Sequence, residues 1–231
     1  MTTITIHQPN YMPWSGFFHK WLISDAFVIL DTVQYHKNEW QNRNQIKTSQ
    51  GAQWITVPVT YRFPQLIHDV GIAQGNWAKK QISSIEQAYA KAPYFEQVWQ
   101  PIKTILQAKH QNLSTLNIAL IVALGQQLGC TAPLHIASNL PIENTDPTTR
   151  LIDICTHLQG TAYLSGAEGR SYLQKDAFAK ANLDLYFQNV QPPTYPQLHG
   201  DFIPYLSVLD LLFNMGHEAQ VIVRNMGDKI S

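Results

Sequence analysis

Charged residues are scarce in this chain. They make up 14% of its 231 residues, and 16 basic side chains balance 16 acidic ones. An average soluble domain has about 25% charged residues. A protein that binds nucleic acid without regard to sequence needs a net basic surface to displace counterions from the phosphates. We therefore expect no nucleic-acid partner.

Cysteines and long apolar runs are also rare. Cys130 and Cys155 stand apart without a CxxC spacing, which favours two reduced thiols over a disulfide or a zinc site. No apolar run approaches the roughly 18 residues that span a bilayer. The N-terminus lacks the basic start and the apolar stretch of a signal peptide. These absences predict a cytoplasmic protein without a membrane span.

Several familiar catalytic motifs are missing. The sequence contains no Walker A loop, no GxGxxG and no GxSxG string. His217 and Glu218 open an HExxH string, but Val221 stands where the second histidine would be. The other histidines lack metal-ligand spacing, so we predict no metal site, and a trio of His7, His36 and His199 is a less favoured alternative.

Apolar residues, in contrast, make up 45% of the chain and alternate between strand and helix patterns. Ala26–Leu30 is a continuous apolar run, typical of a strand buried on both faces. Strands separated by helices predict an α/β fold with a mostly parallel sheet and flanking helices, Rossmann-like in architecture. We expect one domain over residues 1–231, with a helical insertion at about 76–128.

The expected elements follow from periodicity and from start and stop signals. Helices are expected over residues 16–24, 76–91, 93–107, 113–128, 147–160 and 204–215, and strands over 4–6, 26–30, 54–59, 134–137, 163–164 and 183–187. Asp146 and Pro147 form a helix start, and Gly160 ends that helix. Residues 221–223 fit a last strand or a helix tail.

The first candidate site is the stretch from Ile4 to Trp14, where a short β-branched strand ends in polar and aromatic residues. Pro9 and Pro13 keep the following residues out of a helix. A histidine at the end of such a strand lies where open α/β sheets bind ligands. The candidate residues in this stretch are His7, Gln8, Asn10, Tyr11 and Trp14.

A second candidate site covers residues 31–47, directly after the second strand. It combines Asp31 with amides, aromatic residues and cations, and its candidates are Asp31, Gln34, Arg43, Asn44 and Lys47. If the first two strands are parallel, this stretch and His7 share one edge of the sheet. Arg43 is suited to a carboxylate or phosphate, and Lys47 adds a point charge. The alternative is a solvated polar loop.

A third candidate, residues 163–172, has a strand that ends in Ser165-Gly166, followed by Gly169 and a helix expected to start near Arg170. Free backbone N–H groups and a cation at this turn would suit an anion. A plain turn explains the same string equally well.

The fourth candidate lies in residues 195–214, which contain His199 and a strongly apolar helix. Ser207, Asp210 and Asn214 fall on one stripe of that helix. Burial would raise the pKa of Asp210, and a nearby cation would oppose that shift. A structural role for Asp210, tied to backbone N–H groups or an ion pair, is favoured over catalysis.

Five strings together carry a family resemblance: IHQPNYMPW, LDTVQY, WQNRNQIK, YLSG and YPQLHGDFIPYLSVLDLLFNMG. In this order, from His7 to Gly216, they resemble the WbqC-like protein family. One departure is Gln45, at a position where the family pattern suggests a basic residue. The resemblance implies a role in O-antigen and other bacterial surface-polysaccharide biosynthesis, in which an amino acid such as glycine is attached to an amino sugar. It supplies no assigned catalytic residue.

The order of these motifs is also similar to that of nucleotidyltransferases and class I synthetases, although the HxGH string is absent. This analogy implies that His7 donates to a transferring phosphate while Arg43, Lys47 and Arg170 offset its charge. Ser165 and the Gly166 amide would hold the phosphate tail. ATP with Mg²⁺ as cofactor follows from this analogy alone, so the sequence leaves the cofactor open.

Two other hypotheses need no ATP. In the first, His7 or His199 acts as general base for an amine that attacks an activated acyl donor. In the second, the protein is a non-catalytic module that holds a nucleotide sugar or glycan against Tyr11, Trp14, Tyr35 and Trp40. All of these hypotheses predict a small-molecule partner, either a sugar nucleotide or an amino acid, and leave the oligomeric state open.

Overall fold

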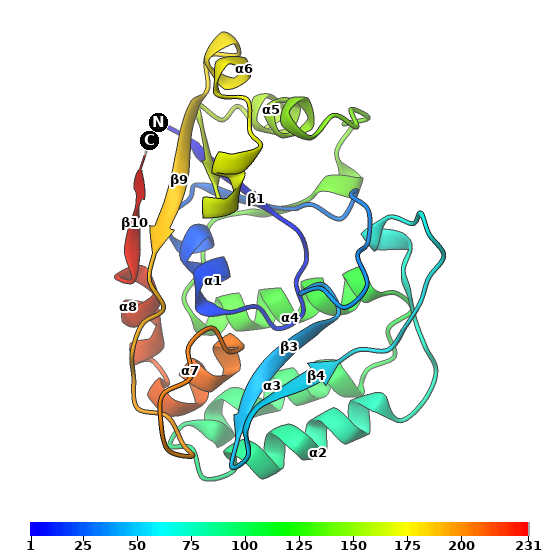
Figure 1. Cartoon of the computed structure of the whole chain (residues 1–231), viewed down its shortest axis with the longest axis vertical. Helices are drawn as coiled ribbons and strands as arrows, with labels where there is room; N and C mark the ends of the chain where they lie inside the picture. Colours follow the sequence, from blue (N-terminus) through cyan, green and yellow to red (C-terminus); the bar gives the residue numbers. More distant parts are fainter. Residues whose placement is uncertain (231) are drawn as a thin grey trace.

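A six-stranded sheet, in the order β10-β9-β8-β1-β2-β7, forms the centre of the protein (Figure 1). The computed structural model describes residues 1–230. The sheet strands are β1 (Thr3–His7), β2 (Ala26–Ile29), β7 (Leu134–Ile136), β8 (Ala162–Ser165), β9 (Asp184–Val190) and β10 (Gly227–Ile230). Every pairing is parallel except that of β10 with β9. The prediction of a mostly parallel, Rossmann-like α/β sheet is confirmed.

The side chains of β1 and β2 divide between two cores, one on each face of the sheet. Ile4 and Ile6 pack with Val28 in one core, and Phe27 and Ile29 belong to the other. This division follows from the two-residue period of a strand, which sends successive side chains to opposite faces. Both faces of β2 are therefore buried, as its continuous apolar run predicted.

Eight α-helices accompany the sheet within residues 1–230. They are α1 (Ser15–Leu22), α2 (Trp77–Tyr89), α3 (Phe95–Gln107), α4 (Leu113–Gln127), α5 (Pro147–His157), α6 (Lys175–Lys180), α7 (Val208–Met215) and α8 (Glu218–Arg224). Apolar residues of α5 and α6 share one core with the sheet, and those of the other helices form the second, larger core. Figure 1 shows α5 and α6 on one side of the sheet and α1 and α4 on the other.

Capping residues fix two of these helix starts. The Asp146 carboxylate accepts a 2.8 Å hydrogen bond from the backbone N–H of Thr149, as expected for an N-cap before Pro147. At the start of α4, the Asn112 side-chain oxygen accepts a 2.8 Å bond from the N–H of Thr115. Both bonds satisfy N–H groups that the first helical turn leaves free.

Two small hairpins lie between β2 and α2. Strands β3 (Arg43–Thr48) and β4 (Gly51–Thr56) form the first, and β5 (Val59–Thr60) and β6 (Gly71–Ile72) form the second. The expected strand at 54–59 is shifted, since β4 begins at Gly51 and ends before Pro58. Strand β3 was not predicted, because its polar residues alternate with only one aliphatic side chain, Ile46.

The C-terminal part also differs from the expected elements. Helix α7 begins at Val208 rather than at residue 204, because Tyr205 has a positive φ of 60° and Ser207 caps the helix. Residues 221–223 lie inside α8 and not in a strand. The last strand, β10, was not predicted, because its residues 227–230 carry no alternating pattern.

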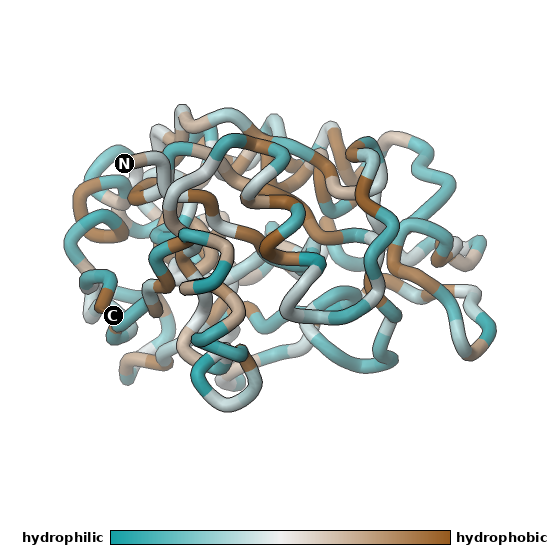
Figure 2. Tube along the Cα trace, turned by 90° about the horizontal axis from the view of Figure 1, so that it is seen from above, coloured by the Kyte–Doolittle hydropathy of each residue, from teal (hydrophilic) through white to brown (hydrophobic). Residues whose placement is uncertain are grey.

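The segment between β6 and β7 contains α2, α3 and α4, where the helical insertion was expected. A single domain over the whole chain stays a prediction. Figure 2 shows that several protruding loops are hydrophilic. No helix within residues 1–230 is long and apolar enough to cross a membrane.

Candidate functional site

The order of strands reverses at β1, and this point locates the candidate site. From β1 the sheet extends through β2 and β7 on one side and through β8 and β9 on the other. In open α/β sheets, ligands bind outside the carboxyl ends of the strands at such a switch point. Here the two diverging strands, β1 and β8, end at His7 and Ser165. We call this junction the switch edge.

His7 stands at the end of β1, with its ring edge against Phe17 at a centroid distance of 4.7 Å. Its Nδ1 lies 2.9 Å from the backbone oxygen of Gln8. Because a carbonyl can only accept, Nδ1 carries the hydrogen, and the lone pair of a neutral imidazole is on Nε2. Burial and the Lys20 charge lower the pKa of His7 to about 3. This neutral form fits a proton acceptor better than the phosphate donor of the ATP-based hypothesis.

Lys20 is a component of the switch edge that the sequence did not reveal. It lies on α1, is only 2% exposed and makes no ion pair within residues 1–230. Burial lowers the pKa of its amine to about 7, and Glu168 opposes that shift. Helical side chains lean toward the helix N-terminus, so Lys20 reaches back to the edge although it is near the end of α1. The sequence contains one feature that could have predicted this role, namely a lysine among the apolar residues of α1.

The turn after β8 places Gly166 at the switch edge. It precedes a short 3-10 helix, η3 (Ala167–Ser171), and not the α-helix expected near Arg170. Arg170 is exposed, with its guanidinium carbon 5.2 Å from the ring centroid of Phe187 on β9. A Cβ atom on Gly169 would lie 2.1 Å from Ser165 Oγ, so a larger residue there would displace this hydroxyl where η3 packs against β8.

Two asparagine side chains hold the loop between β1 and α1. Asn44 Nδ2 donates to the backbone oxygens of Tyr11, at 3.1 Å, and Met12, at 2.7 Å. Asn117 Nδ2, from α4, donates to the backbone oxygen of Pro9 at 2.7 Å. The Asn44 side chain thus holds the backbone of this loop. Asn117 was not among the predicted site residues, although an asparagine in a strongly apolar helix is a recognisable signal in the sequence.

The side chains of this loop have separate partners. Gln8 Oε1 accepts a 2.6 Å bond from Gln41 Nε2, and the Tyr11 hydroxyl donates to Gln81 of α2 at 2.5 Å. The ring of Trp14 packs 5.2 Å from that of Tyr205, measured between ring centroids. Asn10 is half-buried. Of these side chains, Gln8 lies nearest along the chain to His7.

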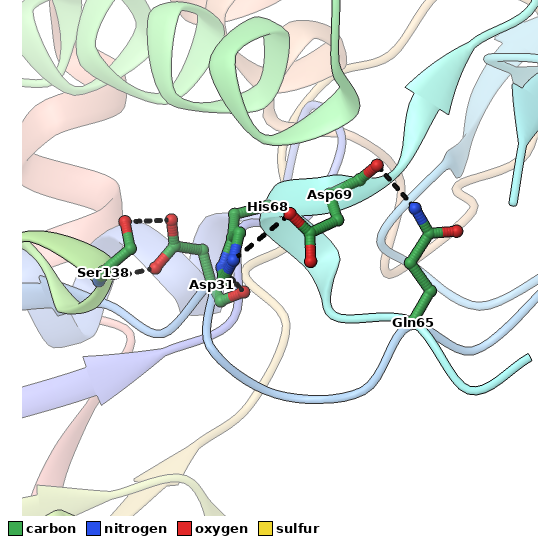
Figure 3. Close-up of polar contacts among 5 residues, drawn as sticks. All are labelled: Asp31, Gln65, His68, Asp69 and Ser138. Carbon is green, nitrogen blue, oxygen red and sulfur yellow. Dashed lines mark hydrogen bonds and ion pairs between the residues drawn. The ribbon is translucent and has the colours of Figure 1, made fainter. Parts of the chain in front are cut away.

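Asp31 follows β2 at the same edge of the sheet, but its carboxylate is occupied (Figure 3). Its two oxygens accept bonds from the backbone N–H of Ser138, at 2.9 Å, and from the Ser138 hydroxyl, at 2.8 Å. His68 Nδ1 lies 3.1 Å from the backbone oxygen of Asp31. Gln34, farther along, forms an isolated bridge with Leu66. Asp31 therefore joins the segments after β2 and β7.

Arg43 lies on the outer face of the β3–β4 hairpin, with its guanidinium carbon 4.2 Å from the ring centroid of Trp54. Trp54 and Trp40 are 42% and 45% exposed, and their ring centroids are 5.5 Å apart. Arg43 Nε and the Tyr35 hydroxyl are buried, and neither has a hydrogen-bond partner in the described part of the chain. We call Trp40, Trp54 and Arg43 the hairpin platform.

Asp210 is fully buried on α7 and is bound by two tyrosines. Its carboxylate accepts bonds from the hydroxyls of Tyr89, at 2.7 Å, and Tyr195, at 2.9 Å. Burial raises the pKa of Asp210, while these two bonds and the Lys47 charge oppose the shift. The arrangement fits the structural role that the sequence favoured.

Lys47 is 1% exposed and donates to oxygens of a single loop. Its Nζ lies 3.1 Å from Gln197 Oε1 and 3.1 Å from the backbone oxygen of Gly200, and it also bonds the backbone oxygen of Asp201. His199 in that loop has its Nε2 2.7 Å from the backbone oxygen of Ala88. All donors of Lys47 thus have protein partners, which leaves little capacity for a ligand.

The structure thus distributes the candidate residues among separate groups. The switch edge has His7, Gln8, Ser165 and Gly166; the outer hairpin has Arg43; the buried network has Lys47, Asp210 and His199. No group of three or more potential metal ligands occurs within residues 1–230. A cavity of about 220 Å³, lined in part by Asp25 and Arg224, lies at the opposite edge, near the start of β2.

Comparison with known proteins identifies the family. The model of the WbqC-like protein family matches residues 8–222. The chain belongs to this family. An uncharacterised protein of Mycobacterium tuberculosis, Rv1507c, is 40% identical over 229 residues, which cover 97% of this chain and 98% of the relative. No solved structure matches the chain.

Proposed function

We propose that this WbqC-like protein is a transferase of bacterial surface-polysaccharide biosynthesis that attaches an amino acid or another acyl group to an amino sugar. The single observation that carries the proposal is the neutral His7 at the switch edge, with Nε2 free to accept a proton. The chain belongs to the WbqC-like family. The resemblance to this family implies a role in surface-polysaccharide biosynthesis, and this supports an amino sugar as the acceptor. Glycine is a suitable donor acid.

The chemistry requires an activated acyl donor, either an acyl thioester, whose leaving group is a thiolate, or an acyl phosphate such as an aminoacyl adenylate. The sugar amine attacks the acyl carbon, a C–N bond forms, and the bond from the acyl carbon to the leaving group breaks with its electron pair on the thiolate sulfur or the phosphate oxygen. The amine proton goes to His7 Nε2. A low pKa makes His7 a weak base in the free protein, but the negative charge of a bound phosphate would raise this pKa, because a nearby anion favours the protonated imidazole.

Mass spectrometry distinguishes the two sources of activation. The protein is mixed with a nucleotide amino sugar and with either ATP plus glycine or a preformed acyl thioester, and the amide product is sought. We expect a product that disappears in His7→Ala and persists in the control His157→Ala, which changes an exposed histidine on α5. ATP–pyrophosphate exchange that depends on glycine would assign the activation step to this protein. Full activity of His7→Ala would refute the proposed role.

The hairpin platform favours a second function, a module that binds a glycan without turnover. Two neighbouring exposed indoles offer apolar faces to sugar rings, and the guanidinium of Arg43 beside Trp54 suits an acidic group on the sugar. This hypothesis predicts that Trp54→Ala abolishes binding of an acidic oligosaccharide, whereas His7→Ala leaves it intact. Isothermal titration calorimetry with both variants tests it, and equal binding by Trp54→Ala and wild type would exclude it.

A further inference from the structure

The two buried lysines differ in their partners. Lys47, at 1% exposure, has three oxygen acceptors around its ammonium. Lys20, at 2% exposure, has no ion pair in the described part of the chain, and the carboxylate that acts on it electrostatically is Glu168. Buried charges in proteins are normally paired, because removing a charge from water is costly. Lys20 thus lacks the counter-charge that its position demands.

The Lys20 amine faces the backbone of Gly166, and few other atoms line the space between them. A Cβ atom on Gly166 would lie 3.8 Å from Lys20 Nζ, and apart from the adjoining residues 165 and 167 no other heavy atom of residues 1–230 would come within 4 Å of that Cβ. The amine and the backbone of Gly166 therefore border the same open space. This space belongs to the switch edge, where the fold places ligands.

We propose that the Lys20 amine binds a phosphate group of the ligand at the switch edge, in front of Gly166, and that it takes up a proton when this group binds. The proposal rests on the proposed function, since it names the residue that holds the phosphate of the activated donor. The ligand supplies the missing counter-charge, and the charge-assisted hydrogen bond favours the protonated amine.

The groups around Lys20 support proton uptake by Lys20 itself. His7 on β1 is neutral, because its pKa is lowered to about 3. His19, next to Lys20 on α1, also has a lowered pKa, through burial, and Asp228 of β10 acts on it in the opposite direction. Glu168 of η3 is the acid facing Lys20, and Gln188 of β9 bonds His19 without charge. With the amine pKa at about 7, most of the free protein holds Lys20 neutral at pH 8.

The test is isothermal titration calorimetry of the full-length protein with inorganic pyrophosphate at pH 8, in two buffers with different ionisation enthalpies. We expect an uptake approaching one proton per pyrophosphate, and an affinity that falls up to tenfold per pH unit above pH 7.

Lys20→Met should bind pyrophosphate at least about tenfold more weakly than the wild type. Lys20→Arg should bind without proton uptake, because the guanidinium is always charged. Lys103→Met, which changes a surface lysine paired with Glu86, should behave as wild type.

The outcomes separate this inference from the proposed function. Binding without proton uptake in the wild type, or unchanged binding by Lys20→Met, would overturn it, and the first measurement needs no variant. Binding of acetate or glycine but not of pyrophosphate would show that Lys20 binds a carboxylate and not a phosphate. This result would also overturn the inference. Proton-coupled binding without amide formation would leave Lys20 in place and refute the transferase. Amide formation at the full rate in Lys20→Met would leave the transferase proposal in place and refute the role of Lys20.

Discussion

The hydroxyl of Tyr89 donates a 2.7 Å hydrogen bond to the buried carboxylate of Asp210. The same hydroxyl accepts a 2.8 Å bond from the backbone N–H of Lys47. A single oxygen atom thus joins α2, α7 and β3, and it satisfies a buried donor and a buried acceptor together. Polar groups in such a position stabilise the fold only while every member of the network is bonded.

Tyr89→Phe therefore tests the structural role of this network. The change leaves the Lys47 N–H and one Asp210 oxygen without their partner, and each unsatisfied buried group costs about 1 to 3 kcal/mol. We expect the free energy of unfolding, measured by urea denaturation, to fall by about 2 to 6 kcal/mol. Tyr172→Phe is the matched control, because Tyr172 is 58% exposed. Equal stability of the two variants would contradict the structural role.

His7 makes the stability of the protein depend on pH. Its pKa is about 3 in the folded protein and 6.5 in the unfolded chain, so the unfolded chain binds the extra proton between these values. The contribution is fully present above pH 6.5 and is lost as pH falls toward 3, by up to about 1.4 kcal/mol per pH unit. His7→Gln should flatten the curve of unfolding free energy against pH in this window, compared with wild type and with His157→Gln. Parallel curves for all three proteins would refute the assignment.

Replacing each buried lysine by methionine should have opposite effects on stability. The pKa of Lys20 is 10.5 in the unfolded chain and about 7 in the folded protein, so its contribution is present above pH 10.5 and lost as pH falls to 7. Lys20→Met should thus raise the unfolding free energy at pH 7 by about 1 to 4 kcal/mol, with the gain vanishing near pH 10.5. Lys47→Met should lower it, because three oxygens lose their donor. Thermal and urea unfolding at both pH values measure this. A loss of stability in Lys20→Met would mean that Lys20 holds the fold together.

Asn117 should control the order of the loop between β1 and α1. Its Nδ2 donates to the backbone oxygens of Pro9 and Gln41, each at 2.7 Å. Asn117→Ala removes both bonds, so we expect faster amide hydrogen exchange in residues 10–14 and an unfolding free energy lower by about 2 to 4 kcal/mol. Asn225→Ala, at an exposed position after α8, serves as control. Unchanged exchange in residues 10–14 would show that other contacts suffice to order the loop.

The sequence predicted those elements that have strong local signals. The apolar run of β2, the cap at Asp146 and the long helices α2, α3 and α4 all appear close to their expected bounds. Strand β3 and strand β10 could not be predicted, because each is defined by its partner strand and not by its own residues. A polar strand has the local pattern of a loop until its partner is known.

The candidate site was predictable only in part, for the same reason. His7 and Gly166 follow from strand ends, which the sequence shows. Lys20 requires knowledge of how α1 packs and of which glycine it faces. Asn44 and Lys47 looked like ligand-binding residues because sequence composition does not distinguish donors that bind a ligand from donors that bind the protein's own carbonyl groups.

The amide donors of Asn44 and Asn117 also bear on the chemical durability of the protein. Each nitrogen faces a backbone oxygen of the loop that leads away from His7. Deamidation would replace such a donor by a carboxylate, and its negative charge would then repel the oxygen it had bound. Asparagine is among the thermolabile residues that proteins from hot environments contain less often. Asn44 lies within β3 and Asn117 within α4, where the ordered backbone keeps the next N–H from attacking the side chain, so the folded protein protects the loop next to His7 from covalent ageing.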